Sequence, residues 1–192
     1  MAYKFDPDKK DHLNTEERKN KMPPKETLEK MMVKKGYKFV DIGTGIGYFS
    51  IPASKIVGDK GKVYAVDTSK EMVAELEQRI KKKGIKNIKI IQGNTYNSDL
   101  SNEKVDYVFF SNVLHEVEDK NKLLSNYLKK LKTGGKIGII EFKKIEISKG
   151  PPVQHKISIK ELKEYYNNLD IEIIKEVTIN DYQYGLVGKK SK

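Results

Sequence analysis

The 192-residue chain contains neither cysteine nor tryptophan. The absence of cysteine excludes disulfide bonds, thiolate metal sites and a thiol nucleophile, and it is compatible with a reducing compartment. No stretch approaches the ~20 apolar residues that a membrane-spanning helix needs, and from the charged start, MAYKFDPDKK, we expect no signal peptide. We therefore expect a cytoplasmic protein without a membrane span, with one domain over residues 1–192.

The chain has fewer acidic than basic residues: 27 Asp and Glu against 38 Lys and Arg, which gives a net charge of +11. Clustered cations can bind a nucleic-acid backbone by releasing its counterions. The lysines gather at 81–89 and 129–136, around the ends of expected helices, where cations also complement the helix dipole. Because that simpler explanation suffices for most of them, nucleic acid is the second choice of partner.

In VDIGTGIGYFS, residues 40–50, glycine occupies the alternate positions 43, 45 and 47, after a short apolar run and Asp41. Glycine lets the backbone approach a ligand closely, and the start of the following helix offers unpaired N–H groups to an anionic end. A second apolar run over 61–66 ends in Asp67. Strand, glycine turn, helix, strand and carboxylate together predict a nucleotide-binding half. The dinucleotide pattern GxGxxG is not met, because Tyr48 occupies the place of its last glycine.

GxGxG with an aspartate two residues before it resembles the first motif of the class I S-adenosylmethionine-dependent methyltransferases. VDYVFFSNVLHEVED, residues 105–119, resembles the family's fourth strand and the loop after it. LLSNYLKKLKTGGKIGIIEF, residues 123–142, resembles the next helix, Gly-Gly turn and fifth strand. The chain is also similar to the ubiquinone- and arsenite-methylating branches, although the arsenite enzymes bind their substrate through cysteines, which are absent here.

Helices and strands alternate along the chain and end in a hairpin, which predicts a mostly parallel α/β sheet. The expected strands are 38–42, 62–66, 88–92, 105–110, 136–141, 171–177 and 182–187, and the expected helices include 24–34, 47–57, 70–83 and 158–168. The resemblance implies a Rossmann-like, seven-stranded sheet of order 3-2-1-4-5-7-6, with the last strand antiparallel and helices on both faces. Residues 36–192 would form this core, with residues 1–35 as an N-terminal extension.

The resemblance implies that S-adenosyl-L-methionine binds at the carboxyl ends of the strands and leaves as S-adenosyl-L-homocysteine. The glycine turn and the aspartate before it would hold the methionyl end, and Asp67 would accept hydrogen bonds from the ribose hydroxyls. In many relatives an acidic residue after the third strand reaches the adenine, and Asn94 and Thr95 stand at that place here. The residues expected to contact the cofactor are Asp41, Gly43, Thr44, Gly45, Gly47, Asp67, Thr68, Asn94, Thr95 and Asn112.

Methyl transfer from a sulfonium is an in-line displacement that needs no metal, so alignment of the acceptor supplies most of the rate. After the fourth strand, His115 stands where an acceptor would lie, and an imidazole of ordinary pKa near ~6.5 can act as general base or only line the pocket. Glu116, Glu141 and His155 are further candidates for acceptor contact. The N-terminal extension is expected either to fold over the cleft as a lid or to be a disordered tail.

The substrate class can be narrowed by a missing motif. Methyltransferases that act on amino groups of DNA bases carry [DN]PP[YF] after the fourth strand to hold the flipped base, and SNVL stands there instead. The sequence therefore favours a small organic acceptor. An RNA methyltransferase is the second reading, and a protein that binds S-adenosylmethionine without catalysis is the third.

Overall fold

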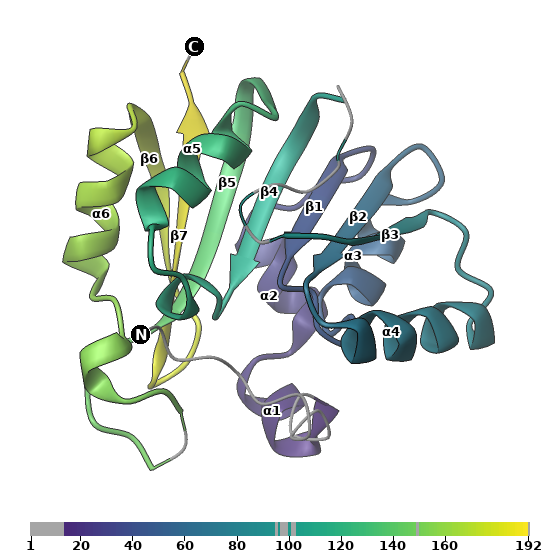
Figure 1. Ribbon diagram of the computed structural model, residues 1–192, viewed down its shortest axis with the longest axis horizontal. Coiled ribbons are helices and arrows are strands. Elements are labelled where there is room, and N and C mark those ends of the chain that lie inside the picture. Colours follow the sequence, from purple (N-terminus) through teal and green to yellow (C-terminus); the bar gives the residue numbers. More distant parts are fainter. Residues whose placement is uncertain (1–13, 95, 97–99, 101–102, 149, 192) are drawn as a thin grey trace.

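The computed structural model describes residues 14–94, 96, 100, 103–148 and 150–191, which fold as one seven-stranded sheet flanked by helices (Figure 1). The strands are β1 (Lys38–Ile42), β2 (Lys62–Asp67), β3 (Ile88–Gln92), β4 (Val105–Ser111), β5 (Leu131–Phe142), β6 (Ile171–Thr178) and β7 (Gln183–Lys190). The helices are α1 (Glu16–Lys21), α2 (Pro24–Lys30), α3 (Ser50–Val57), α4 (Lys70–Lys82), α5 (Lys120–Leu128) and α6 (Ile159–Asn168), with short 3₁₀ helices η2 (Leu114–Glu116) and η3 (Val153–His155).

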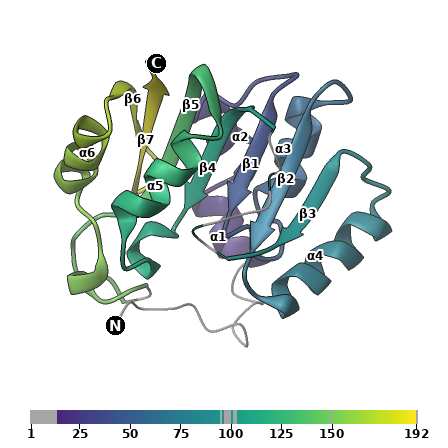
Figure 2. The ribbon, with the colours of Figure 1, turned by 45° about the horizontal axis from the view of Figure 1, so that its top comes forward.

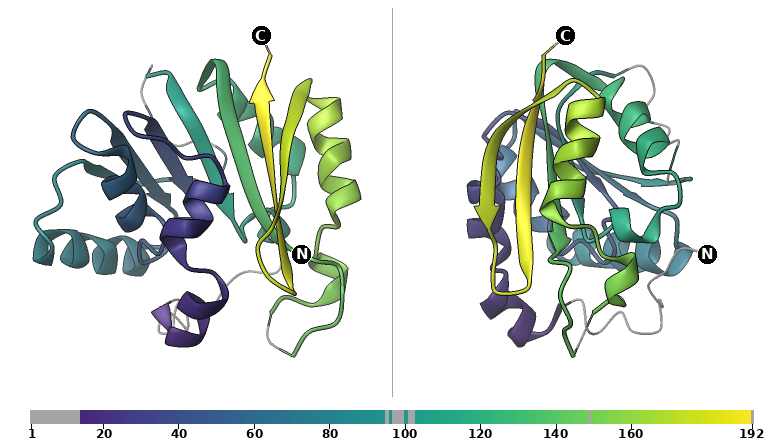
Figure 3. Two further views of the ribbon diagram at one scale, coloured as in Figure 1. Left: turned by 180° about the vertical axis from the view of Figure 1, so that it is seen from behind. Right: turned by 90° about the vertical axis from the view of Figure 1, so that its left-hand side faces the viewer.

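The strand order is β3-β2-β1-β4-β5-β7-β6, which confirms the predicted topology. Strands β3, β2, β1, β4 and β5 pair in parallel, whereas β7 is antiparallel to both β5 and β6. Helices α2, α3 and α4 cover one face of the sheet, and α5 and α6 cover the other (Figure 3). The chain is thus a Rossmann-like α/β fold with one reversed strand.

The central strands β1 and β4 are buried on both faces, which explains their nearly continuous apolar sequences. Towards α2 and α3, the rings of Phe39, Phe49 and Phe109 pack with centroids 5.1 to 5.6 Å apart. Towards α5, the rings of Phe110 and Tyr127 pack edge to face at 5.6 Å. Aromatic layers on both faces therefore fix the strands whose carboxyl ends carry the expected site.

Helix α3 begins at Ser50, so the predicted start at Gly47 was too early. The glycines of the turn have positive φ angles, and Gly47 itself has φ +82°, a conformation that cannot continue a right-handed helix. Pro52 is the third residue of α3. Proline is tolerated there because the N–H groups of the first helical turn have no partner within the helix.

The other differences lie at element ends and in the N-terminal extension. Helix α2 ends at Lys30 rather than residue 34, because Met32 adopts a left-handed φ of +65°. Strand β5 begins at Leu131, five residues before its predicted start. Helix α1 was not predicted, and residues 1–13 of the proposed lid lie outside the described residues. No helix in the described part of the chain is long and apolar enough to cross a membrane.

Candidate functional site

The carboxyl ends of β1, β2, β4 and β5 meet at one edge of the sheet (Figure 2). The connection from β1 leads to β2 on one side, whereas β4 lies on the other side of β1. Open α/β sheets bind their ligands at such a switch in strand order, outside the carboxyl ends. The residues predicted from the sequence follow these strand ends.

The turn after β1 is held in its shape by glycine. The φ angles are +67° at Gly43, +54° at Gly45 and +82° at Gly47. Residues other than glycine adopt such positive φ angles only at a cost in free energy. A β-carbon at Gly43 would lie 2.5 Å from a methyl group of Val113, and one at Gly47 would clash with the side chain of Leu76. The turn therefore packs tightly against its neighbours, and within it Gly43 is exposed, Gly45 is partly exposed and Gly47 is buried.

Asp41 lies beneath this turn and is 2% exposed. Its Oδ2 accepts hydrogen bonds from the hydroxyls of Thr44 at 3.1 Å and Ser50 at 2.7 Å. Burial raises the pKa of Asp41 to about 6, against the opposing effect of these two hydrogen bonds and with a smaller contribution from the charge of Asp67. In the described contacts Asp41 is an internal support of the turn, and Ser50 is a partner that the sequence did not suggest.

Asp67 closes β2 and reaches the same turn from the neighbouring strand. Its Oδ2 accepts the N–H of Gly45 at 2.7 Å, and its Oδ1 accepts the N–H of Ser69 at 3.0 Å. Burial raises the pKa of Asp67, while the backbone N–H groups of Ser69, Gly45 and Thr68 oppose the rise. Thr68 is exposed beside it. The predicted ribose carboxylate and the predicted glycine turn are thus in direct contact.

The side-chain oxygens of the two asparagines of the expected site both accept hydrogen bonds from within the protein. Asn94 is exposed, and its Oδ1 accepts the N–H of Tyr96 at 2.9 Å, whereas Thr95 lies outside the described residues. Asn112 follows β4 with a left-handed φ of +58°, and its Oδ1 accepts a hydrogen bond from Nε2 of Gln183 at 2.8 Å. Asn112 therefore joins the end of β4 to β7 at the site edge.

His115 and Glu141 form a buried pair, 4% and 0% exposed. Nδ1 of His115 lies 2.8 Å from Oε2 of Glu141, and Oε1 of Glu141 accepts the N–H of Leu114 at 2.8 Å and, at 3.4 Å, that of His115. The ring of Phe142 packs edge to face against the imidazole at 5.8 Å. Glu116 is nearby, with Oε1 3.8 Å from the imidazole Nε2. The structure thus brings together three of the four residues predicted for acceptor contact.

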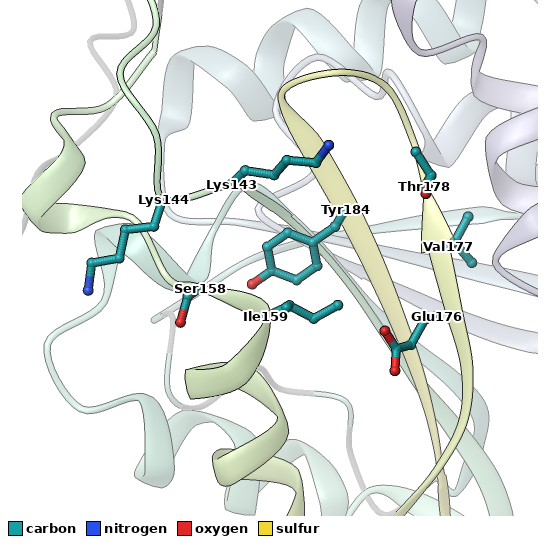
Figure 4. Close-up of a pocket in the computed structure, with 8 residues that line it drawn as sticks. All are labelled: Lys143, Lys144, Ser158, Ile159, Glu176, Val177, Thr178 and Tyr184. Carbon is teal, nitrogen blue, oxygen red and sulfur yellow. The ribbon is translucent and has the colours of Figure 1, made fainter.

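A pocket of about 420 Å³ opens between the start of α6, the loop after β5 and the β6–β7 hairpin (Figure 4), and neither His115 nor Glu141 lines it. Tyr184 on its wall is the direct cross-strand partner of Glu141, so their side chains share one face of the sheet. The eight lining residues are Lys143, Lys144, Ser158, Ile159, Glu176, Val177, Thr178 and Tyr184. His155, the fourth residue predicted for acceptor contact, lies in η3 and is not among them.

Helix α1 contributes a feature that the sequence did not suggest. The guanidinium of Arg18 lies 4.0 Å from the centre of the Tyr48 ring, in the turn before α3. The Tyr48 hydroxyl donates to the carbonyl of Met22 at 2.7 Å. Burial lowers the pKa of Arg18, although the charges of Tyr48 and Asp41 act against it. The extension is therefore docked beside the glycine turn. A basic residue in a polar helix gives no sequence signal for this placement.

Comparison with known proteins agrees with this geometry. A family model described as a methyltransferase domain matches residues 33–184. A crystal structure of a SAM-dependent methyltransferase from Aquifex aeolicus is similar with a TM-score of 0.91 and 31% identity, covering 97% of this chain and 99% of that one. The chain belongs to the S-adenosylmethionine-dependent methyltransferases, and S-adenosylmethionine is the cofactor of that class.

Two curated relatives match a shorter region. A demethylmenaquinone methyltransferase of Geobacillus sp. (strain WCH70) is 34% identical over 116 residues, covering 60% of this chain and 50% of the relative. A probable cobalt-precorrin-6B C(15)-methyltransferase (decarboxylating) of Sulfurisphaera tokodaii is 34% identical over 113 residues, covering 58% and 57%. The chain thus spans about half the length of the curated relatives it matches.

Proposed function

We propose that this chain transfers a methyl group from S-adenosylmethionine to a small organic acceptor at the carboxyl edge of the sheet. The observation that carries the proposal is the contact between Asp67 and Gly45, which joins the two elements that would grip the cofactor. Each carboxylate oxygen of Asp67 can accept more than one hydrogen bond. Oxygens that hold N–H groups of the protein can therefore also receive the two hydroxyls of a ribose.

The donors and charges at this edge fit the cofactor. The glycine turn, where Gly43 is exposed and Gly45 is partly exposed, would offer backbone to the methionyl end, and the carboxylates of Asp41 and Asp67 favour a positive sulfonium nearby. When bound, S-adenosylmethionine supplies a methyl group activated by the positive sulfur. Of the residues expected from the sequence, Asp67 and the glycine turn would bind and orient the cofactor, while Asp41 supports the turn from beneath.

The acceptor would extend from His115 into the pocket beyond Glu141 and Tyr184. That pocket combines apolar surface from Ile159 and Val177 with hydroxyl groups and with three charged side chains, those of Lys143, Lys144 and Glu176. Apolar surface with a few polar groups is suited to a small organic molecule. The curated relatives named above carry the names of small-molecule methyltransferases. Demethylmenaquinone in its reduced, electron-rich form is therefore the first acceptor to test.

Two assays test the proposal in sequence. Calorimetry compares S-adenosylmethionine with a nicotinamide dinucleotide, and we expect the former to bind more tightly. The protein is then incubated with methyl-labelled S-adenosylmethionine and a panel containing reduced demethylmenaquinone, simple phenols, amines and bulk RNA. Label in a small organic product supports the proposal, whereas preference for the dinucleotide or absence of label in every acceptor contradicts it.

RNA methylation stays as the second candidate because of the net charge of +11. It predicts label in RNA and binding that weakens steeply as salt is raised, since binding would release counterions. Label in RNA but in none of the small acceptors would replace the first proposal by this one.

A further inference from the structure

We infer that Glu141 is a positioning residue, which orients His115 so that Nε2 of the imidazole accepts the proton of the methyl acceptor. The inference rests on the proposed function, because it assigns a step to residues of the same site. It adds a role for Glu141 that differs from the direct acceptor contact expected from the sequence.

The geometry leaves Glu141 little room for contact with a substrate. Its side chain is 0% exposed, and its two oxygens are engaged by Nδ1 of His115 and by the backbone N–H groups of Leu114 and His115. A buried carboxylate must be compensated by hydrogen bonds or charge. The hydrogen bonds of Glu141 therefore hold η2 and the imidazole of His115 in place.

The contact with Nδ1 determines which nitrogen of His115 is basic. An ionised carboxylate can only accept hydrogen bonds, so Nδ1 must carry the proton that joins it to Oε2 of Glu141. In the neutral ring, Nε2 is then the unprotonated nitrogen. A carboxylate that orients an imidazole in this way also stabilises the imidazolium formed when Nε2 takes up a proton.

Some of the charged groups around the pair raise the pKa of His115 and others lower it. Burial by itself lowers the pKa of His115, but Glu141 and, more weakly, Glu116 raise it, whereas Lys120 of α5 opposes them, and the net effect is a raised pKa. Tyr184 of β7 faces Glu141 and has its own pKa raised by burial and by that carboxylate. The packed ring of Phe142 carries no charge. The carboxylate of Glu141 is thus the main group that favours a protonated imidazole.

The acceptor's electron pair forms a bond to the methyl carbon while the carbon–sulfur bond breaks, and its electrons stay on sulfur as a neutral thioether. The acceptor's proton moves to Nε2 of His115, which becomes an imidazolium paired with Glu141. The proton then leaves to solvent, which restores the neutral ring.

The first test uses the unaltered protein and no ligand. Long-range ¹H–¹⁵N spectra of ¹⁵N-histidine-labelled protein, recorded above the pKa of His115, report which ring nitrogen is protonated, and His115→Gln identifies the signal. We expect protonated Nδ1 and unprotonated Nε2. Protonated Nε2 in the neutral ring would overturn the inference.

The second test replaces Glu141→Gln, which keeps the volume and an oxygen for the backbone N–H groups. The amide NH₂ would then donate to Nδ1, so the proton of the neutral ring would move to Nε2 and block it as a base. We expect the tautomer to reverse, the His115 titration to shift to lower pH, and kcat for the acceptor that takes label to fall on the order of a hundredfold or more. Glu116→Gln should leave the tautomer unchanged, and Glu172→Gln, an exposed change on β6, should leave both tautomer and activity unchanged.

The outcomes separate the two claims. A reversed tautomer with unchanged kcat would overturn the proton-acceptor role, and an unchanged tautomer and titration would overturn the positioning role. If no acceptor takes label from the unaltered protein, the proposed function and the proton-acceptor role both fall, while the tautomer still decides the geometry. If Glu141→Gln does not fold, as circular dichroism would reveal, the spectra of the unaltered protein decide instead.

Discussion

The carboxylate of Asp67 accepts the backbone N–H of Gly45 across 2.7 Å, although the two residues are 22 positions apart. This bond connects the end of β2 to the turn after β1. This hydrogen bond therefore links the part of the site proposed for the ribose directly to the part proposed for the methionyl end. A change at either residue should be felt in cofactor affinity.

Replacing Asp67→Ala should weaken the binding of S-adenosylmethionine by roughly 1 to 3 kcal/mol, because the ribose hydroxyls and the N–H of Gly45 lose a shared acceptor. Calorimetry measures the difference directly. Asp67→Asn keeps one oxygen and should lose less affinity than Asp67→Ala. Equal affinity in all three proteins would place the ribose elsewhere.

Replacing Gly43→Ala should destabilise the fold more than Gly84→Ala. Both glycines have positive φ, +67° and +62°, so each alanine costs roughly 1 to 2 kcal/mol of backbone strain. Only the new β-carbon at Gly43 meets a side chain, Val113 at 2.5 Å, whereas nothing lies within 4 Å of one at Gly84. Overpacking should add about 1 to 3 kcal/mol. Urea denaturation of both variants measures the contrast, and equal losses would show that the turn has room to spare.

The ionisation of Asp41 should make stability depend on pH. Burial raises the pKa of this carboxyl to about 6, so the folded state holds its proton more tightly than the unfolded state, where the pKa is about 4. Relative to Asp41→Asn, the free energy of unfolding of the unaltered protein should therefore fall between about pH 4 and pH 6, by up to about 3 kcal/mol. Denaturation at several pH values gives this difference, and a difference that is flat or rises with pH would contradict the raised pKa of Asp41.

Filling the pocket next to Tyr184 should weaken the use of the acceptor and leave the binding of S-adenosylmethionine unchanged. Ile159→Trp places a large ring among the lining residues, so kcat/KM for the acceptor should fall about tenfold or more while the Kd of S-adenosylmethionine stays within about twofold. Ile145→Trp makes the same change at an exposed residue outside the lining and serves as the control. Equal kinetics in both variants would move the acceptor out of this pocket.

The family resemblance implied the strand order, and the sequence pattern placed Asp67 and the glycine turn at the same edge of the sheet, because parallel strands bring their carboxyl ends together. The hydrogen bond between Asp67 and Gly45 was not predicted. The sequence could not predict contacts made by side chains that are distant along the chain. Arg18 over Tyr48 depends on how α1 returns to the turn, and Glu141 beside His115 depends on the register of β5. Helix ends were also missed at Gly47 and Met32, where a left-handed backbone decides the boundary.

A crystal structure of the protein soaked with S-adenosylhomocysteine would test the proposed cofactor site most directly. We predict the ribose hydroxyls within hydrogen-bond distance of Asp67, and the amino-acid end of the ligand against the turn from Gly43 to Gly47. Density for the ligand at another place, or an empty edge at saturating concentration, would contradict the assignment.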